Sequence, residues 1–156
     1  MRSFKFNLIF VVVSLLASCV KESFARVRNG HASASVKTLD SAMKSSGKCS
    51  LQKSDIEKRW KEFFAVINEK DFKEDGGSCM CGKCVRVRGV AAGNTRTSKI
   101  GTVYAKVVDV CSSDECKKGE IGFSEKTIDA FARYSWDSSR LKWDVVPCPE
   151  RSNLRG

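Results

Sequence analysis

Three cysteines stand within six residues at positions 79–84, in the sequence Cys-Met-Cys-Gly-Lys-Cys, and a strand-like alternation follows directly. A cluster of this kind binds a metal ion, carries a redox thiol or crosslinks a small extracellular domain. Each possibility imposes a different fold, so this cluster constrains the chain more than any other feature. Which one applies depends first on the compartment in which the protein folds.

The N-terminus has the form of a secretory signal. Arg2 and Lys5 make a basic head, and the apolar run over residues 8–17 is too short to span a membrane. Small residues before the predicted cleavage point indicate that the signal, residues 1–25, ends after Ala25. We therefore expect a secreted, extracellular protein.

A competing interpretation concerns residues 16–19, Leu-Ala-Ser-Cys, which also fit a bacterial lipobox. Cleavage there would leave Cys19 lipidated and the protein tethered to a membrane as a bacterial lipoprotein. Unless Cys19 is lipidated, no contact with a membrane is expected.

The mature chain is expected to be small and basic. About 131 residues remain after Ala25, which is one domain on length grounds. They retain 25 basic and 17 acidic residues, a net charge of +8. This charge favours anionic surfaces such as acidic polysaccharide, cell wall, phospholipid or nucleic acid, and does not choose among them.

Seven cysteines remain in the mature chain: Cys49, Cys79, Cys81, Cys84, Cys111, Cys116 and Cys148. In an oxidising compartment they predict a disulfide framework. A zinc site at the Cys81–Cys84 turn would need a second CxxC pair or a histidine pair, and His31 is the one histidine of the chain. A redox site would place this turn at a helix N-terminus, whereas a strand pattern follows it. We therefore expect disulfides, with no metal and no cofactor.

The odd number leaves one thiol over. It is free, it is bonded to another molecule, or the cleavage site is wrong and Cys19 is retained.

The remaining sequence indicates short strands with a few helices. Residues 26–47 are polar and predict a flexible arm, and residues 150–156 predict a C-terminal tail. Helices are expected from Ser54, with a capping box, and from Ser124 as N-cap. The expected strands are residues 84–90, 102–110 and 141–146, whereas residues 64–67 fit either a strand or a continuing helix. This pattern suggests a compact β-barrel with helical additions.

Five segments carry a resemblance to a known family: FAVINEKDF (64–72), CMCGKCVRVRG (79–89), TVYAKVVDVC (102–111), GEIGFSEKTIDAF (119–131) and KWDVVPC (142–148). Their order resembles the double-psi β-barrel shared by barwin, the expansin N-terminal domain, rare lipoprotein A and the family-45 glycoside hydrolases. The resemblance implies a mainly β fold, a six-stranded double-psi β-barrel stapled by disulfides, over residues 48–149. It also implies a disulfide pattern, with Cys49 bonded to Cys81, Cys84 to Cys148, and Cys111 to either Cys116 or Cys79, leaving the other unpaired.

The resemblance bears on catalysis through two acids. In catalytic relatives an acid in the segment that matches residues 120–124 protonates the glycosidic oxygen, and a second carboxylate activates water. Here Gly122 stands at the acid position and Glu120 at the position of a family histidine. Asp109 is retained at the end of its strand, where it is either a groove carboxylate that binds sugar or, as we favour, a structural acid that satisfies the backbone of the Ser112-Ser113 turn. Asp109 and Glu120 are the catalytic candidates, and hydrolysis is not expected.

Aromatic and basic residues suggest a binding surface. Sugar rings stack on exposed aromatic rings, and the alternation around Trp143 predicts that this residue is part of the core instead. The candidate ligand-binding residues are Tyr104, Asp109, Trp136, Arg86 and Lys106.

We therefore expect a monomeric, expansin-like or barwin-like protein that binds cell-wall polysaccharide, anionic or neutral, without cutting it. One alternative is a protein-binding module, a protease inhibitor or host-directed effector, that uses loops 94–99 or 112–118. A second is a weak glycoside-cleaving enzyme that uses Asp109 and Glu120. Nucleic acid is not an expected partner, because no aromatic platform interleaves with the basic residues.

Overall fold

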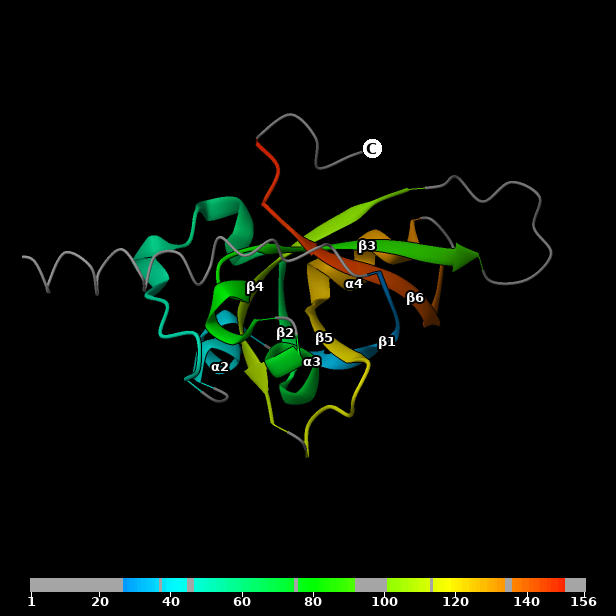
Figure 1. Ribbon diagram of the computed structural model, residues 1–156. Helices are drawn as coiled ribbons and strands as arrows, with labels where there is room; N and C mark the ends of the chain where they lie inside the picture. The colour runs from blue at the N-terminus through cyan, green and yellow to red at the C-terminus, as the bar shows by residue number, and fades with distance from the viewer. Residues whose placement is uncertain are drawn as a thin grey trace, which may run out of the picture.

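The computed structural model describes residues 27–36, 38–44, 47–74, 76–91, 101–112, 114–133 and 136–150. The predicted signal, residues 1–25, lies outside them. Six strands close into a barrel (Figure 1): β1 (Arg28–Val36), β2 (Phe64–Asn68), β3 (Cys84–Ala91), β4 (Val103–Cys111), β5 (Glu120–Ser124) and β6 (Trp136–Val146). The helices are α2 (Leu39–Lys44), α3 (Glu69–Glu74) and α4 (Glu125–Ala132), with 3-10 turns η1 (Lys53–Asp55), η2 (Lys58–Lys61) and η3 (Gly77–Met80). No helix among the described residues is long and apolar enough to cross a membrane.

The strand order around the barrel is β1-β5-β2-β4-β3-β6. β1 runs parallel to β5 and β2 parallel to β4, and the other four pairings are antiparallel. Exchanging β1, β2 and β3 for β4, β5 and β6 leaves this order and these directions unchanged. The connectivity therefore has an internal two-fold relation, and the predicted six-stranded barrel is confirmed.

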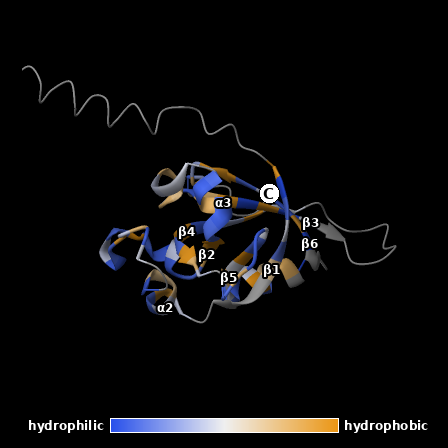
Figure 2. Ribbon diagram, turned by 60° about the horizontal axis from the view of Figure 1, so that its bottom comes forward, coloured by the Kyte–Doolittle hydropathy of each residue, from blue (hydrophilic) through white to orange (hydrophobic). Residues whose placement is uncertain are grey.

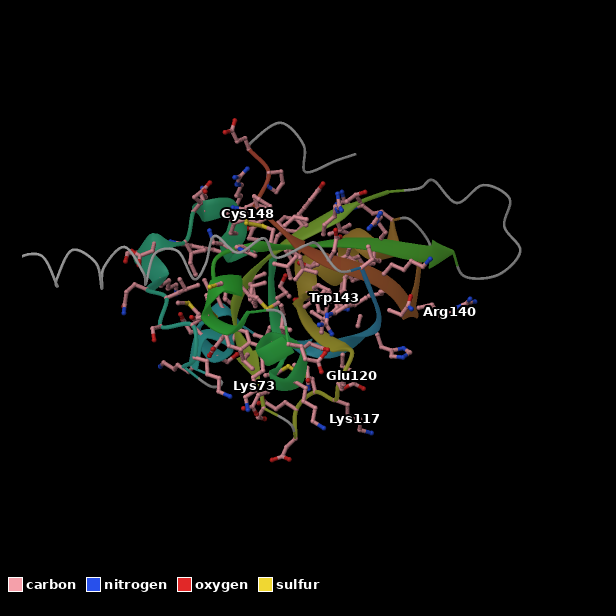
Figure 3. All side chains as sticks on the ribbon, in the orientation of Figure 1. Lys73, Lys117, Glu120, Arg140, Trp143 and Cys148 are labelled. Carbon is pink, nitrogen blue, oxygen red and sulfur yellow. A yellow bond between two sulfur atoms is a disulfide. The ribbon has the colours of Figure 1, made fainter. Side chains whose placement is uncertain are left out.

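The barrel interior is filled by apolar side chains at alternate strand positions. β3 contributes Val85 and Val87, and β6 contributes Leu141, Trp143 and Val145. Trp143 is fully buried and lies in the middle of the barrel (Figure 3), which confirms its prediction as a core residue. Burial of each Val or Leu side chain contributes about 1.5–3 kcal/mol to the free energy of unfolding.

A second apolar cluster lies outside the barrel wall. Phe64 and Val66 of β2 and Val108 of β4 point outward from the wall, and residues of the segment 38–63 cover them, among them Ile56 and Trp60. Figure 2 shows hydrophobic residues along β2 and β4 at the centre of the molecule. Both faces of β2 are therefore buried, as are both faces of β4 over residues 107–111.

The flexible arm predicted for residues 26–47 is wrong for most of its length, because β1 and α2 lie within it. β1 pairs with β5 on one side and β6 on the other. Its residues are mostly small or polar, so the sequence lacks the alternation of large apolar side chains that marks a strand. The barrel accordingly begins at Arg28 rather than near residue 48.

The helix expected from Ser54 is also wrong. Two short 3-10 turns, η1 and η2, occupy this stretch, and Ile56 between them has extended backbone, with φ −93° and ψ 116°. Phe64 begins a strand, which decides the alternative left open for residues 64–67. By contrast, Ser124 caps α4 as predicted, since its hydroxyl accepts a hydrogen bond from the Thr127 N–H at 3.3 Å.

Three disulfides within the described residues staple the barrel: Cys49–Cys81, Cys84–Cys148 and Cys111–Cys116. The first two pairs are those that the resemblance implied, and the third is one of its two options. The second pair joins residues 64 apart and stabilises the fold by roughly 4 kcal/mol in the chain-entropy treatment. Because Cys79 is also disulfide-bonded, the expected unpaired thiol at Cys79 or Cys116 is wrong.

The first prediction concerns Gly30, where β1 lies against the core. A Cβ at this position would lie 2.3 Å from the Gly119 carbonyl oxygen and 2.7 Å from Trp143 Nε1. We expect Gly30→Ala to lower the free energy of unfolding by roughly 2–4 kcal/mol, because neither the backbone nor the buried indole can move away. Denaturant unfolding would measure the loss, with Asn29→Ala, at an exposed side chain of the same strand, as the control. Equal stability of both variants would contradict this packing.

Candidate functional site

The position at which catalytic relatives carry an acid lies in a row across four strands. Gly122 of β5 pairs with Ser33 of β1 and with Val66 of β2, and Val66 in turn pairs with Asp109 of β4. The residues on either side of Gly122 are part of the interior core, so Gly122 faces outward. Neither β1 nor β2 contains an Asp or Glu. Neither strand beside Gly122 therefore supplies a carboxylate in place of the missing acid.

Asp109 lies at one end of this row and is buried, with 1% of its surface exposed. Its carboxylate accepts hydrogen bonds from the backbone N–H groups of Gly47 at 2.8 Å, Lys48 at 3.0 Å and Cys49 at 3.3 Å. Charge-assisted bonds of this kind are about twice as strong as neutral ones. Asp109 thus holds residues 47–49, part of the segment 38–63, onto β4. A role of Asp109 in ligand binding stays a prediction.

Glu120 is half-buried, and its Oε2 accepts the backbone N–H of Lys117 at 2.8 Å. Figure 3 shows Glu120 and Lys117 near each other, below Trp143. β2 lies between β5 and β4, and Glu120 is two residues away along β5 from the row that contains Asp109, so strand spacing and register place the Cα atoms of Glu120 and Asp109 roughly 12 Å apart. Asp109 is buried and bound by residues 47–49, whereas Glu120 is bound by Lys117 and stays half-buried. The structure does not bring the two candidate catalytic acids together as a pair around one site.

Three other candidates meet on a different surface. Outward-facing residues of β3, β4 and β6 form what we call the β3 outer face: Arg86, Arg88, Tyr104, Lys106, Lys142 and Asp144. Strand register places Tyr104 opposite Arg86, and Arg86 opposite Asp144, in one row. The predicted residues Arg86, Tyr104 and Lys106 therefore share one surface. Trp136 begins β6, and its side chain lies outside the described part of the chain.

An ion pair organises the centre of this face. Asp144 is fully buried, and Arg86 binds both of its carboxylate oxygens, with Nε donating to Oδ1 at 3.0 Å and Nη2 donating to Oδ2. Arg88 approaches the same carboxylate, its Nη2 lying 3.5 Å from Oδ1. The hydrogen bonding of Arg86 to the Asp144 carboxylate raises the pKa of Arg86, with a smaller contribution from Tyr104. Arg86 is thus held in a fixed direction while 35% of its side chain stays exposed.

Asp144 is a functional candidate that sequence reasoning missed. It follows the core residue Trp143, so the alternation along β6 already placed it on the outward face. Its partner, Arg86, is 58 residues away, and the register between β3 and β6 was needed to match them.

Tyr104 supplies the aromatic surface of the face. It is half-buried, and it packs against the second apolar cluster while its neighbour across the strand is Arg86. Lys106, two residues further along β4, is also half-buried. A ring held beside charged donors on a flat strand surface suits a hydroxyl-rich or anionic ligand.

A second polar cluster closes one end of the barrel. Asp71, buried in α3, accepts hydrogen bonds from Arg28 Nη1 at 2.6 Å and from the Gly119 N–H at 2.8 Å. Glu74 accepts from Lys118 Nζ at 2.6 Å and from Arg28 at 3.3 Å, and the Lys118 contact chiefly lowers the pKa of Glu74. These charges satisfy one another, so the cluster connects β1, α3 and the loop before β5. Within the described residues, no three His, Cys, Asp or Glu side chains form a metal-binding group.

Three solved structures are similar to this one. A mutant GH45 endoglucanase in complex with cellobiose has 16% sequence identity and a TM-score of 0.49, over 78% of this chain and 82% of that one. A mutant expansin of Clavibacter michiganensis in complex with cellohexaose has 17% identity and a TM-score of 0.46, over 81% of this chain and 53% of the expansin. A second structure of a GH45 endoglucanase with cellobiose has 21% identity and a TM-score of 0.46, over 78% and 81% of the two chains. No protein-family model and no curated protein matches the sequence.

At these identities the likeness concerns the fold alone. The closed barrel and its strand order confirm the predicted double-psi β-barrel.

The second prediction tests the role of Asp109. In Asp109→Asn an amide group replaces one oxygen and faces backbone donors, so we expect a loss of roughly 2–4 kcal/mol in the free energy of unfolding. Amide hydrogen exchange at residues 47–49 should accelerate, and Asp114→Asn, at an exposed acid, serves as the control. A variant with unchanged stability and unchanged exchange would show that these bonds do not hold the segment.

The third prediction concerns Glu69, whose Oε1 contacts Lys48 Nζ and lies 3.0 Å from Lys73 Nζ. The hydrogen bond from Lys48, followed by that from Lys73, lowers the pKa of Glu69 to about 2. Because the folded-state pKa lies below the ordinary 4.5, the contribution to stability is complete above pH 4.5 and is lost as the pH falls towards 2.

An NMR titration of the Glu69 carboxyl should show this low midpoint, and Lys48→Met should move it upward. A midpoint near 4.5 in the unmodified protein would exclude the ion pair in solution.

Proposed function

We propose that this chain is a secreted protein that binds cell-wall polysaccharide without hydrolysing it, through the β3 outer face. The observation that carries the proposal is the row of Tyr104, Arg86 and Asp144. It presents an aromatic ring and a charged donor whose direction is already fixed. A preorganised surface loses little side-chain entropy when a ligand binds, which favours recognition of an extended polymer.

The absence of hydrolysis in the proposal rests on Gly122. Glycosidic cleavage needs a proton donor at the leaving oxygen and a second carboxylate for water. Gly122 has no side chain, Asp109 is engaged by three backbone N–H groups, and Glu120 lies across an intervening strand. Secretion is supported by the signal-like N-terminus together with the disulfides, which form in oxidising compartments.

The fourth prediction is tested by depletion from solution. Protein with intact disulfides is mixed with insoluble cellulose, chitin, pectin-rich wall and peptidoglycan, and the unbound fraction and released sugar are measured. We expect retention on at least one polymer with no sugar release. Tyr104→Ala should weaken retention about five-fold, since ring contacts contribute ~1 kcal/mol, whereas Tyr104→Phe, which keeps the ring, should not.

Two outcomes would contradict the proposal. Failure to bind any of the four polymers would remove polysaccharide as the partner and favour the protein-binding alternative. Sugar release that is lost in both Asp109→Asn and Glu120→Gln, while thermal unfolding shows both variants to be folded at the assay temperature, would establish the enzyme alternative instead.

A further inference from the structure

The β3 outer face carries an excess of positive charge. Its cations are Arg86, Arg88, Lys106 and Lys142, and Asp144 is the one carboxylate that the described side chains place there. Asp144 is fully buried beneath Arg86 and Arg88, so its charge is neutralised within the protein. A ligand on this face therefore meets three positive charges in excess and no exposed carboxylate among the described side chains.

Arg88 has donors left over. Its one ion-pair partner among the described residues is Asp144, at 3.5 Å, and the Asp144 oxygen concerned already accepts the shorter bond from Arg86. The Nε of Arg88 is buried without a hydrogen-bond partner in the described part of the chain. An unsatisfied buried donor destabilises the protein, and 40% of the Arg88 side chain is exposed. A planar guanidinium with free N–H groups matches a carboxylate through two parallel bonds.

The cations are spread along the strands rather than gathered at one point. Lys106 is level with Cys84, Arg86 follows, and Lys142 is level with Arg88. Outward-facing positions recur about every 6.6–6.8 Å along a strand. Charges spaced in this way suit an extended polymer with a negative charge on successive units better than a single small anion.

From these observations we infer that the polysaccharide carries carboxylates, that is, a polyuronate. The inference rests on the proposed function and names its ligand class: uronate carboxylates bind Arg88, Lys142 and Lys106, and a sugar ring lies against Tyr104.

Two other anionic partners fit this face less well. Single-stranded nucleic acid would require several stacking rings, and Tyr104 is the aromatic residue that the described side chains place on this face. An anionic membrane would favour apolar side chains for insertion. Val27, the large exposed hydrophobic residue of the described chain, borders this face, because its neighbour Asn29 pairs with Lys142 of β6, but a single valine offers little apolar surface for insertion.

The fifth prediction uses two forms of one polymer. Polygalacturonate and its fully methyl-esterified form share a backbone and differ in charge, so comparing them isolates the carboxylate. We expect the full-length, disulfide-intact protein to bind polygalacturonate at least about ten-fold more tightly than the ester, measured by titration calorimetry at low salt. Added salt should reduce this difference, because exposed charges are screened.

Paired variants locate the binding face. Arg88→Gln combined with Lys142→Gln should weaken binding to polygalacturonate about ten-fold or more and weaken binding to the ester much less. The control combines Lys44→Gln on α2 with Lys70→Gln on α3, which removes the same net charge from exposed lysines elsewhere. This control should bind like the unmodified protein, and thermal unfolding should show that both double variants are folded.

Each result has one meaning. Equal binding to both polymers would overturn the carboxylate class and leave the proposed function standing, whereas no binding to these two or to the four wall polymers would overturn the proposed function itself. Equal weakening in the control variant, or none in the Arg88/Lys142 variant, would overturn the assignment to this face. Binding to single-stranded DNA or to phosphatidylserine vesicles as tight as to polygalacturonate would also overturn the inference.

Discussion

Closure of six strands into one barrel is the constraint on which the rest of this structure depends. A small closed barrel has an interior just wide enough for side chains, so apolar residues such as Trp143 fill it and polar side chains must lie on the outside. The segment 38–63 then covers the outside of β2 and β4, fastened by the carboxylate of Asp109 and by the Cys49–Cys81 disulfide. What remains for function is the wall that this segment leaves open, which includes the β3 outer face.

The part of the fold that the sequence predicted is the part with strong alternation. β3, β4 and residues 141–146 of β6 place large apolar residues at every second position, and these segments were found from the residues alone. β1 and β5 were not. β1 is built largely from Ala, Ser and Gly, and β5 is five residues long with Gly122 at its centre. Pairing with neighbouring strands, rather than their own side-chain pattern, keeps these two segments extended. The expectation of six strands therefore came from the family resemblance.

Some residues of the candidate site could also be predicted from the sequence, whereas their partners could not. Residue type and alternation were enough to select Arg86, Tyr104 and Lys106, because each lies next to a core position on its own strand. They were not enough to find Asp144 as the partner of Arg86, since that depends on the register between strands far apart in the sequence. Likewise, the acid at Asp109 could be read from the chain, but its three donors come from a loop about 60 residues earlier.

The two-fold relation in the strand order has a consequence for how such a chain reaches its native state. All six pairings join a strand of the first half, β1 to β3, with a strand of the second half, β4 to β6. Neither half can form a ladder of its own, so an emerging chain has no sheet to build until β4 has left the ribosome. β1 must wait for β5 and β6. Non-local pairing of this kind folds slowly and leaves strand edges unpaired during folding. Aggregation of folding intermediates is therefore a greater risk for this chain than unfolding of the native barrel.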